Sequence, residues 1–321
     1  MIARRTGLLL ARLGIAGAIL GVILLRTHPG KLNVQWSPTT SLAFAGAVAV
    51  QLAALAISAV RWKLILEDGP VRATWSYLFR LYMIGNFFSI FLPTSIGGDA
   101  VRVVAVAPTA GGTVRAAVSI LLDRLAGVAA LGAYLIIGLA VGGSALNPLG
   151  AVRWRWPVWE VAAGILAVTI GGWVGLRWLR RRFARLREAW ATGWELVTSL
   201  AQDRRRLAAI IATSLLVQGA YIVAWMILGA GLGLPIRGVL YLVCVPIVSL
   251  GAMLPVTFSG LGVREGVWLL LLASLNAPKA LILAFSLLYF AALVVVAAIG
   301  GLVFLIRGTA EVTGVTGSAP A

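Results

Sequence analysis

The fold is decided by the stretch Tyr82-Met-Ile-Gly-Asn-Phe-Phe-Ser-Ile-Phe-Leu-Pro-Thr-Ser-Ile-Gly-Gly-Asp-Ala-Val-Arg102. It begins as an apolar helix, breaks at Pro93 and continues through a turn of small residues that contains Gly97 and Gly98. An acid, Asp99, and a base, Arg102, follow the turn directly. Proline and glycine interrupt a helix in this way, so the sequence predicts two short helical arms joined by a break.

The other half of the chain repeats this plan in Gly251-Ala-Met-Leu-Pro-Val-Thr-Phe-Ser-Gly-Leu-Gly-Val-Arg-Glu265. The break again begins with proline and continues through hydroxyl and glycine residues, and a charged couple follows: Pro255, Ser259, Gly260, Gly262, Arg264 and Glu265. In a membrane protein, two interrupted apolar segments at corresponding places in two halves indicate a transport site.

The composition indicates a polytopic membrane protein. Of 321 residues, 61% are hydrophobic and only 12% are charged, whereas about a quarter are charged in a typical soluble domain. The net charge of +17 comes from cations placed between apolar spans, which fits an anionic lipid surface rather than nucleic acid. Cys244 and His28 are the only cysteine and histidine. We therefore expect no disulfide within the chain, no metal site and no cofactor.

Hydropathy predicts about six full spans, over residues 8–25, 40–62, 115–141, 158–176, 207–229 and 280–306. The broken segments 77–98 and 239–276 are predicted to be re-entrant hairpins, which are tolerated where their backbone is buried in protein or lines a cavity. Basic loops place both termini in the cytoplasm of a bacterial-type plasma (inner) membrane. Arg61 and Lys63 are assigned to one such loop, and Trp62 to an anchor at the membrane interface.

The domain organisation is predicted as one transmembrane domain over residues 1–307, with a disordered tail at 308–321. Its two halves, about 40–141 and 207–306, each consist of a span, a hairpin and a span, with opposite orientations. This is an inverted-topology repeat in an all-α fold. Between the halves, residues 177–206 hold nine arginines and apolar residues at spacings of three and four. That pattern predicts an amphipathic helix on the inner leaflet, serving either to recruit anionic lipid or only to orient the chain.

Several ionisable residues fall within the predicted membrane depth. Asp123 lies about 12 Å along its helix from Arg115, well below the headgroups. An isolated charge at the bilayer centre costs about 2.5–3.5 kcal/mol, so such groups pair or face a cavity. The candidate substrate-binding residues are Asp99, Arg102, Asp123, Arg124, Arg264 and Glu265, with Asn86 and Ser259 as polar neighbours. Arg264 is the best phosphate ligand, because guanidinium bonds phosphate oxygens bidentately. The alternative is that the ion pairs only lock helices together.

These blocks resemble the flippase-like family related to the membrane region of lysyl-phosphatidylglycerol synthases. The resemblance rests on Arg61-Trp62, on the segment from Gly85 to Arg102, on Leu122-Asp123-Arg124 and on the segment from Pro255 to Glu265, and it covers about residues 8–307. It implies two facing re-entrant hairpins and movement of lipid between leaflets. In the synthases an aminoacyl-transfer domain follows the membrane part, whereas this chain stops at residue 321, so lipid synthesis is not expected.

We therefore predict a lipid flippase or transporter, not an enzyme, that moves a phospholipid or a polyprenyl-phosphate-type lipid. The alternatives are a small-solute permease and a membrane subunit that presents lipid to a separate transferase. Anionic phospholipid or lipid phosphate is the expected partner, with a homodimer or a partner transferase as further options. A membrane-embedded hydrolase is not supported, because the spans contain no histidine base and no Gly-x-Ser-x-Gly motif.

Overall fold

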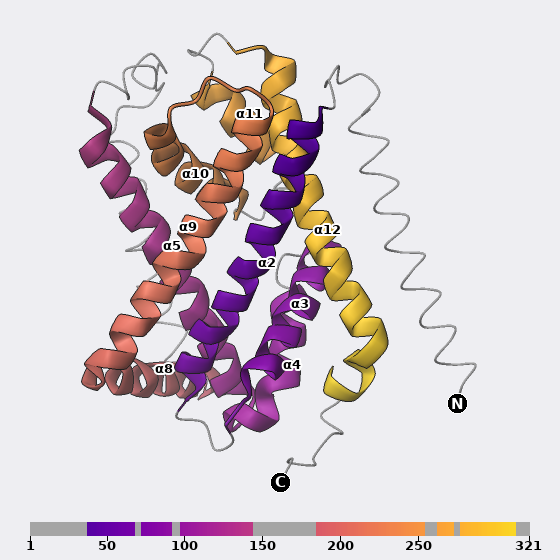
Figure 1. Cartoon of the computed structure of the whole chain (residues 1–321). Helices are drawn as coiled ribbons and strands as arrows, with labels where there is room; N and C mark the ends of the chain where they lie inside the picture. Colours follow the sequence, from indigo (N-terminus) through magenta and orange to yellow (C-terminus); the bar gives the residue numbers. More distant parts are fainter. Residues whose placement is uncertain are drawn as a thin grey trace.

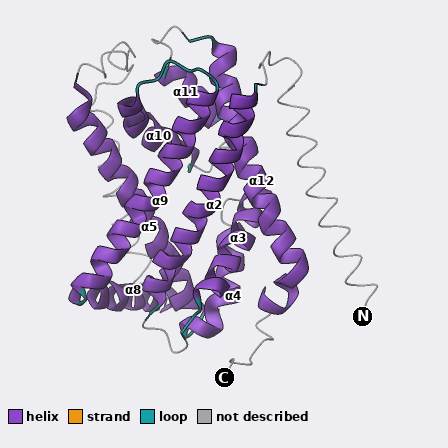
Figure 2. Cartoon of the chain, in the orientation of Figure 1, coloured by secondary structure: helices purple, strands orange, loops and turns teal. Residues whose placement is uncertain are grey.

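The computed structural model describes residues 37–67, 72–91, 97–143, 184–253, 262–272 and 277–312. Within these residues every regular element is an α-helix (Figures 1 and 2). The helices are α2 (Pro38–Leu66), α3 (Trp75–Phe91), α4 (Gly97–Ala110), α5 (Thr113–Gly142), α8 (Ala184–Gln202), α9 (Arg204–Gly231), α10 (Gly238–Ala252), α11 (Val263–Leu271) and α12 (Lys279–Val312).

Four helices are long and apolar enough to cross a membrane: α2, α5, α9 and α12 up to Ile306. They confirm the predicted spans at 40–62, 115–141, 207–229 and 280–306 to within a few residues. The predicted spans at 8–25 and 158–176 lie outside the described residues. The last helix continues to Val312, so the first residues of the predicted tail are helical. The protein is therefore a multi-pass helical membrane protein.

Two pairs of short helices occupy the positions of the broken segments. The helices α3 and α4 have 17 and 14 residues, and α10 and α11 have 15 and 9. Each is shorter than the roughly 20 residues that a membrane span needs. The pair α3 and α4 lies in the half of the bundle that holds α8, and the pair α10 and α11 lies in the other half (Figure 1).

Glycines predicted to break these segments have other roles. Gly97 and Gly98 are the first two residues of α4 rather than part of the break. A Cβ on Gly98 would lie 2.0 Å from the backbone oxygen of Gly85 in α3, so this glycine lets the two arms touch. Gly262, at φ 86°, is the N-cap of α11, a backbone conformation that favours glycine. Pro93, Pro255, Ser259 and Gly260 lie outside the described residues.

The two largest hydrophobic cores among the described residues lie in different halves of the bundle. One is built around Trp62 and Tyr82, between α2, α3, α4 and α5. The other is built around Trp225, Trp268 and Phe285, between α9, α10, α11 and α12. The long helix α2 contributes to both cores, and it packs against α9 through a hydrogen bond of 3.0 Å from the Thr40 hydroxyl to the Gly231 carbonyl.

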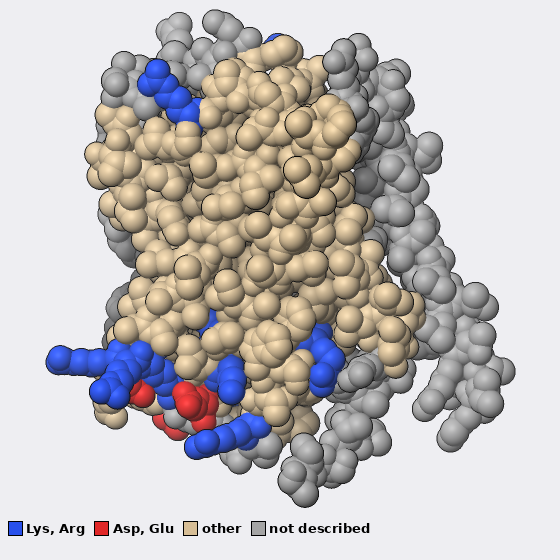
Figure 3. Space-filling model, viewed as in Figure 1, with Lys and Arg blue, Asp and Glu red and all other residues tan. Residues whose placement is uncertain are grey.

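The amphipathic stretch forms α8, which lies across one end of the bundle (Figure 1). It buries Leu196 and Leu200 and exposes Trp190 and Trp194. The helix ends at Gln202, and residues 203–206 begin α9, with the Asp203 carboxylate accepting hydrogen bonds from two backbone N–H groups. Cations gather at this end of the molecule, below a wide uncharged band (Figure 3), which is the distribution of a protein embedded in lipid.

Candidate functional site

A buried cluster of charges lies where α2, α3, α4 and α5 meet, with Asp123 at its centre. Asp123 is 2% exposed, and its Oδ1 accepts a hydrogen bond of 2.8 Å from Arg61 Nε. Its Oδ2 accepts a hydrogen bond from the Tyr82 hydroxyl and lies 3.5 Å from Arg102 Nη2. One carboxylate thus bridges two arginines that come from different helices. The attraction among the three groups offsets the cost of burying them, so removing any one would leave the others insufficiently paired.

Arg102 is held between aromatic rings. Its guanidinium carbon lies 4.1 Å from the ring centroid of Trp62 and 3.9 Å from that of Tyr82, distances at which cation–π attraction is strong in a desolvated site. Its Nη1 lies 3.5 Å from Asp99 Oδ1, one turn back on α4. Gly85 makes this position possible, because a Cβ there would lie 2.7 Å from Arg102 Cδ.

Asp99 also forms an ion pair with Arg124 of α5. Arg124 is 45% exposed and Asp99 is 17% exposed, so this pair lies at the accessible side of the buried cluster. The cluster as a whole contains Arg61, Arg102 and Arg124 against the two aspartates. It therefore carries an excess of one positive charge, which favours an anionic ligand.

The structure corrects the assignment of Arg61 and Trp62. The sequence placed Arg61 in a basic loop and Trp62 at the membrane interface, but α2 continues to Leu66 and both residues are buried. Arg61 Nη1 also lies 3.4 Å from Ser214 Oγ of α9, and Trp62 Nε1 donates a hydrogen bond of 3.1 Å to Ser119 Oγ. Arg61 is therefore a member of the charge cluster that sequence reasoning missed. Its helical spacing of three from buried Ser58 is the signal that marks it as inward-facing.

The second pair of predicted site residues lies on α11, in the other half of the bundle (Figure 1). Arg264 is buried, with its guanidinium carbon 5.9 Å from the Tyr289 centroid and 5.5 Å from that of Phe290. Glu265 has other partners: Oε2 accepts a hydrogen bond of 2.5 Å from Gly262 N, and Oε1 accepts one of 2.8 Å from the Ser286 hydroxyl. Glu265 thus caps α11 and ties it to α12, while Arg264 faces aromatic rings.

The remaining predicted site residues are placed as follows. Asn86 is half-buried on α3, and its Nδ2 group has no hydrogen-bond acceptor in the described part of the chain. Ser259 falls outside the described residues. The six charged candidates therefore form two groups rather than one, and the four from α4 and α5 are directly linked. Among the described residues no cluster of three or more histidine, cysteine, aspartate or glutamate side chains could hold a metal ion.

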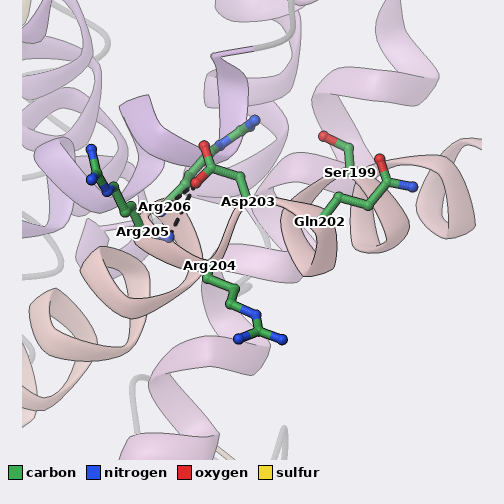
Figure 4. Close-up of a pocket in the computed structure, with 6 residues that line it drawn as sticks. All are labelled: Ser199, Gln202, Asp203, Arg204, Arg205 and Arg206. Carbon is green, nitrogen blue, oxygen red and sulfur yellow. Dashed lines mark hydrogen bonds between the residues drawn. The ribbon is translucent and has the colours of Figure 1, made fainter.

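A separate basic pocket opens at the corner between α8 and α9 (Figure 4). It is lined by Ser199, Gln202, Asp203, Arg204, Arg205 and Arg206. Asp203 is engaged in capping α9, and Arg206 Nε donates a hydrogen bond of 2.7 Å to the Leu64 carbonyl. Arg204 and Arg205 point outward from the corner (Figure 4), where cations attract anionic headgroups.

Comparison with known proteins identifies the family. Neither a search of curated proteins nor a search of solved structures finds a match to this chain. A family model described as the lysylphosphatidylglycerol synthase TM region matches residues 9–301, which confirms the resemblance drawn from the sequence blocks. With that match over nearly its whole length, and with a bundle of membrane-spanning helices around a buried charge cluster, the chain belongs to the family of the lysylphosphatidylglycerol synthase membrane region.

Proposed function

We propose that this protein moves a phosphate-bearing lipid between the two leaflets of a membrane and that it carries out no covalent chemistry on that lipid. The observation that carries the proposal is the buried cluster around Asp123. It holds three arginines against two aspartates in a bundle of membrane-spanning helices. Arg61, Arg102 and Asp123 are buried, whereas Arg124, which supplies the excess positive charge, is 45% exposed. A guanidinium at the accessible side of a buried ion network suits a phosphate.

The order of helices supports transport. A long helix, two short helices and a long helix follow one another as α2 to α5, and again as α9 to α12. The short pairs lie in opposite halves of the bundle (Figure 1), as expected for re-entrant hairpins that enter from opposite sides. In this inverted-repeat arrangement, each hairpin offers a half-site to one leaflet. Arg102 would hold the lipid phosphate in one half and Arg264 in the other, while the acyl chains stay in lipid.

The proposed function includes binding of α8 to the membrane surface. The helix α8 exposes Trp190 and Trp194 beside the basic corner of α8 and α9, which suits contact with anionic phospholipid in the cytoplasmic leaflet of a plasma membrane. Aspartate or glutamate protonation is the coupling route that this chemistry offers if transport is driven rather than passive.

Neutralising either arginine is expected to slow transport. Arg102→Gln and Arg264→Gln should each reduce the initial rate of transbilayer movement of a fluorescent phosphatidylglycerol analogue in proteoliposomes by about 10- to 100-fold. Loss of one hydrogen bond to a charged group costs about 1.5–3 kcal/mol, which corresponds to this range. The measurement is the fraction of the label that dithionite bleaches over time.

Arg237→Gln is the matched control, because Arg237 is an exposed arginine at the N-cap of α10 and should leave the rate unchanged. A wild-type rate in both buried-site variants would contradict the proposed site. Movement of water-soluble anions that is indifferent to lipid would instead favour a small-solute permease. A stable complex with a transferase, without any lipid movement, would favour a lipid-presenting subunit.

A further inference from the structure

A buried polar side chain in the middle of α2, Gln51, takes part in neither group of charged residues and has no hydrogen-bond partner among the described residues. Gln51 of α2 is 1% exposed, and neither its amide nitrogen nor its amide oxygen has a hydrogen-bond partner among the described residues. Buried polar groups in native proteins are almost always bonded, so an exception calls for a ligand, a water or a functional reason. The cost of leaving both amide atoms unbonded is substantial inside a membrane.

Gln51 lies on the face of α2 that is turned into the bundle. Buried residues recur along this face at spacings of three and four, as Thr40, Ala43, Ala47, Gln51, Ala54, Ser58 and Arg61. The two core clusters meet here, because Ala47, one turn before Gln51, belongs to the core around Trp225, and Leu55, one turn after it, belongs to the core around Trp62. Gln51 therefore stands at the boundary between the two halves of the protein.

The packing of α2 against α9 places Tyr221 at the same depth. Thr40 bonds the Gly231 carbonyl at one end of this interface, and Arg61 lies 3.4 Å from Ser214 at the other. Gln51 lies 11 residues along α2 from Thr40, and Tyr221 lies 10 residues along α9 from Gly231, so both are roughly 15–17 Å from that end.

Aromatic contacts lead from α9 toward the arginine in the other half of the bundle. The ring of Tyr289 stacks on that of Trp225, one turn after Tyr221 on α9, with centroids 3.8 Å apart. The guanidinium carbon of Arg264 lies 5.9 Å from the Tyr289 centroid. Gln51 of α2 therefore lies between the level of Arg61 and the core that contains Arg264's aromatic neighbour Tyr289.

We propose that the Gln51 carboxamide is an intermediate binding site for the phosphodiester headgroup on its way between the two arginine sites. This inference rests on the proposed lipid transport. The amide N–H groups can donate to a phosphate oxygen, and the amide oxygen can accept from a hydroxyl or ammonium group of the headgroup. The amide carries no charge, so it binds the headgroup more weakly than the arginines do. A weak middle site between two stronger ones lets a ligand enter and also leave.

The test uses Gln51→Leu in the full-length protein. Leucine has a similar size and no polar atoms, so it removes the cost of the unbonded amide. The melting temperature in detergent should therefore rise, by about 2–4 °C. The rate of transbilayer movement of the phosphatidylglycerol analogue should fall by about tenfold, because the headgroup loses its middle site. Higher stability with lower transport is a combination that a structural glutamine would not produce.

Gln218→Leu is the matched control for stability. Gln218 is also a buried glutamine at the α2–α5–α9 contact, but its Nε2 donates a hydrogen bond of 3.3 Å to the Gly127 carbonyl. Removing that bond leaves the carbonyl without this donor, so the melting temperature should fall. The two glutamine substitutions should thus shift the melting temperature in opposite directions.

Each other outcome overturns the proposal in a recognisable way. A lower melting temperature for Gln51→Leu would show that the amide has a partner within the protein. A higher melting temperature with a wild-type transport rate would show that the site binds only water. Entrapped inorganic phosphate should be retained by wild-type and variant liposomes alike, and its release by the wild type alone would assign the site to a soluble phosphate. If the wild-type protein moves no lipid, the proposed function itself is contradicted. This outcome is measured on the wild type alone, so it is distinct from a failure of the Gln51 proposal.

Discussion

Asp123→Asn is expected to lower the free energy of unfolding by about 3–5 kcal/mol and to abolish lipid movement. The substitution keeps the shape of the side chain but removes the charge that Arg61 and Arg102 share. Both guanidiniums are buried, and removing one partner of a buried ion pair leaves the other charge uncompensated. The measurement is equilibrium unfolding in mixed micelles, together with the dithionite assay in proteoliposomes.

A charge-balanced double variant provides the control. Asp123→Asn combined with Arg61→Gln removes one charge of each sign and leaves Arg102 paired with Asp99. We expect it to recover at least half of the lost stability, since neutral replacements for a buried pair are often tolerated. Transport should remain impaired, because the arrangement around Arg102 is still altered. A loss below about 1 kcal/mol for Asp123→Asn would place Asp123 in contact with solvent and would contradict the buried site.

Gly98→Ala is expected to cost about 1–3 kcal/mol of stability and most of the transport activity. The added Cβ would lie 2.0 Å from the Gly85 carbonyl oxygen and 2.1 Å from Ser89 Oγ. The first of these is backbone, so α4 must move away from α3. Arg102 lies one turn further along α4, and any such shift changes its distance from Asp123 and from the rings of Trp62 and Tyr82.

Gly132→Ala is the comparison for this variant. Gly132 lies within α5, and no atom lies within 4 Å of a Cβ built there. Alanine at a helical position without a clash stabilises a protein by about 0.4–1 kcal/mol. The two glycine substitutions should therefore change the melting temperature in opposite directions. If Gly98→Ala matched Gly132→Ala in stability and transport, the close contact between α3 and α4 would have no role in the site.

The sequence was most informative where a pattern depends on local chain geometry. Long apolar runs predicted α2, α5, α9 and α12, because about 20 apolar residues suffice to define a span. The spacing of three between Asp99 and Arg102 puts both side chains on one face of a helix, and their charged atoms lie 3.5 Å apart. Both inferences need only the geometry of a single helix.

Inferences that depend on neighbouring helices were less complete. Arg61 and Trp62 stand beside Lys63 and Glu67, so their surroundings in the sequence resemble a membrane interface. Their burial is decided by α5 and α9, which supply Asp123, Ser119 and Ser214. Likewise, Arg264 and Glu265 were predicted together as candidate binding residues, but the Glu265 carboxylate accepts hydrogen bonds from the Gly262 backbone and from Ser286 of α12. The partners Asp123, Ser119, Ser214 and Ser286 all lie more than 20 positions away in the sequence, so these contacts could not be predicted from the neighbouring residues.

The corner at Asp203 has a mechanical consequence. Only this residue separates the surface helix α8 from the upright helix α9, and its side chain closes the first turn of α9. Because a single residue joins the two helices, we expect a displacement of α8 by the surrounding bilayer to be passed on to the first turn of α9. Ser214 lies within three turns of that corner and touches Arg61. A continuous structural connection therefore runs from the membrane-surface helix α8 through α9 to the guanidinium of Arg61.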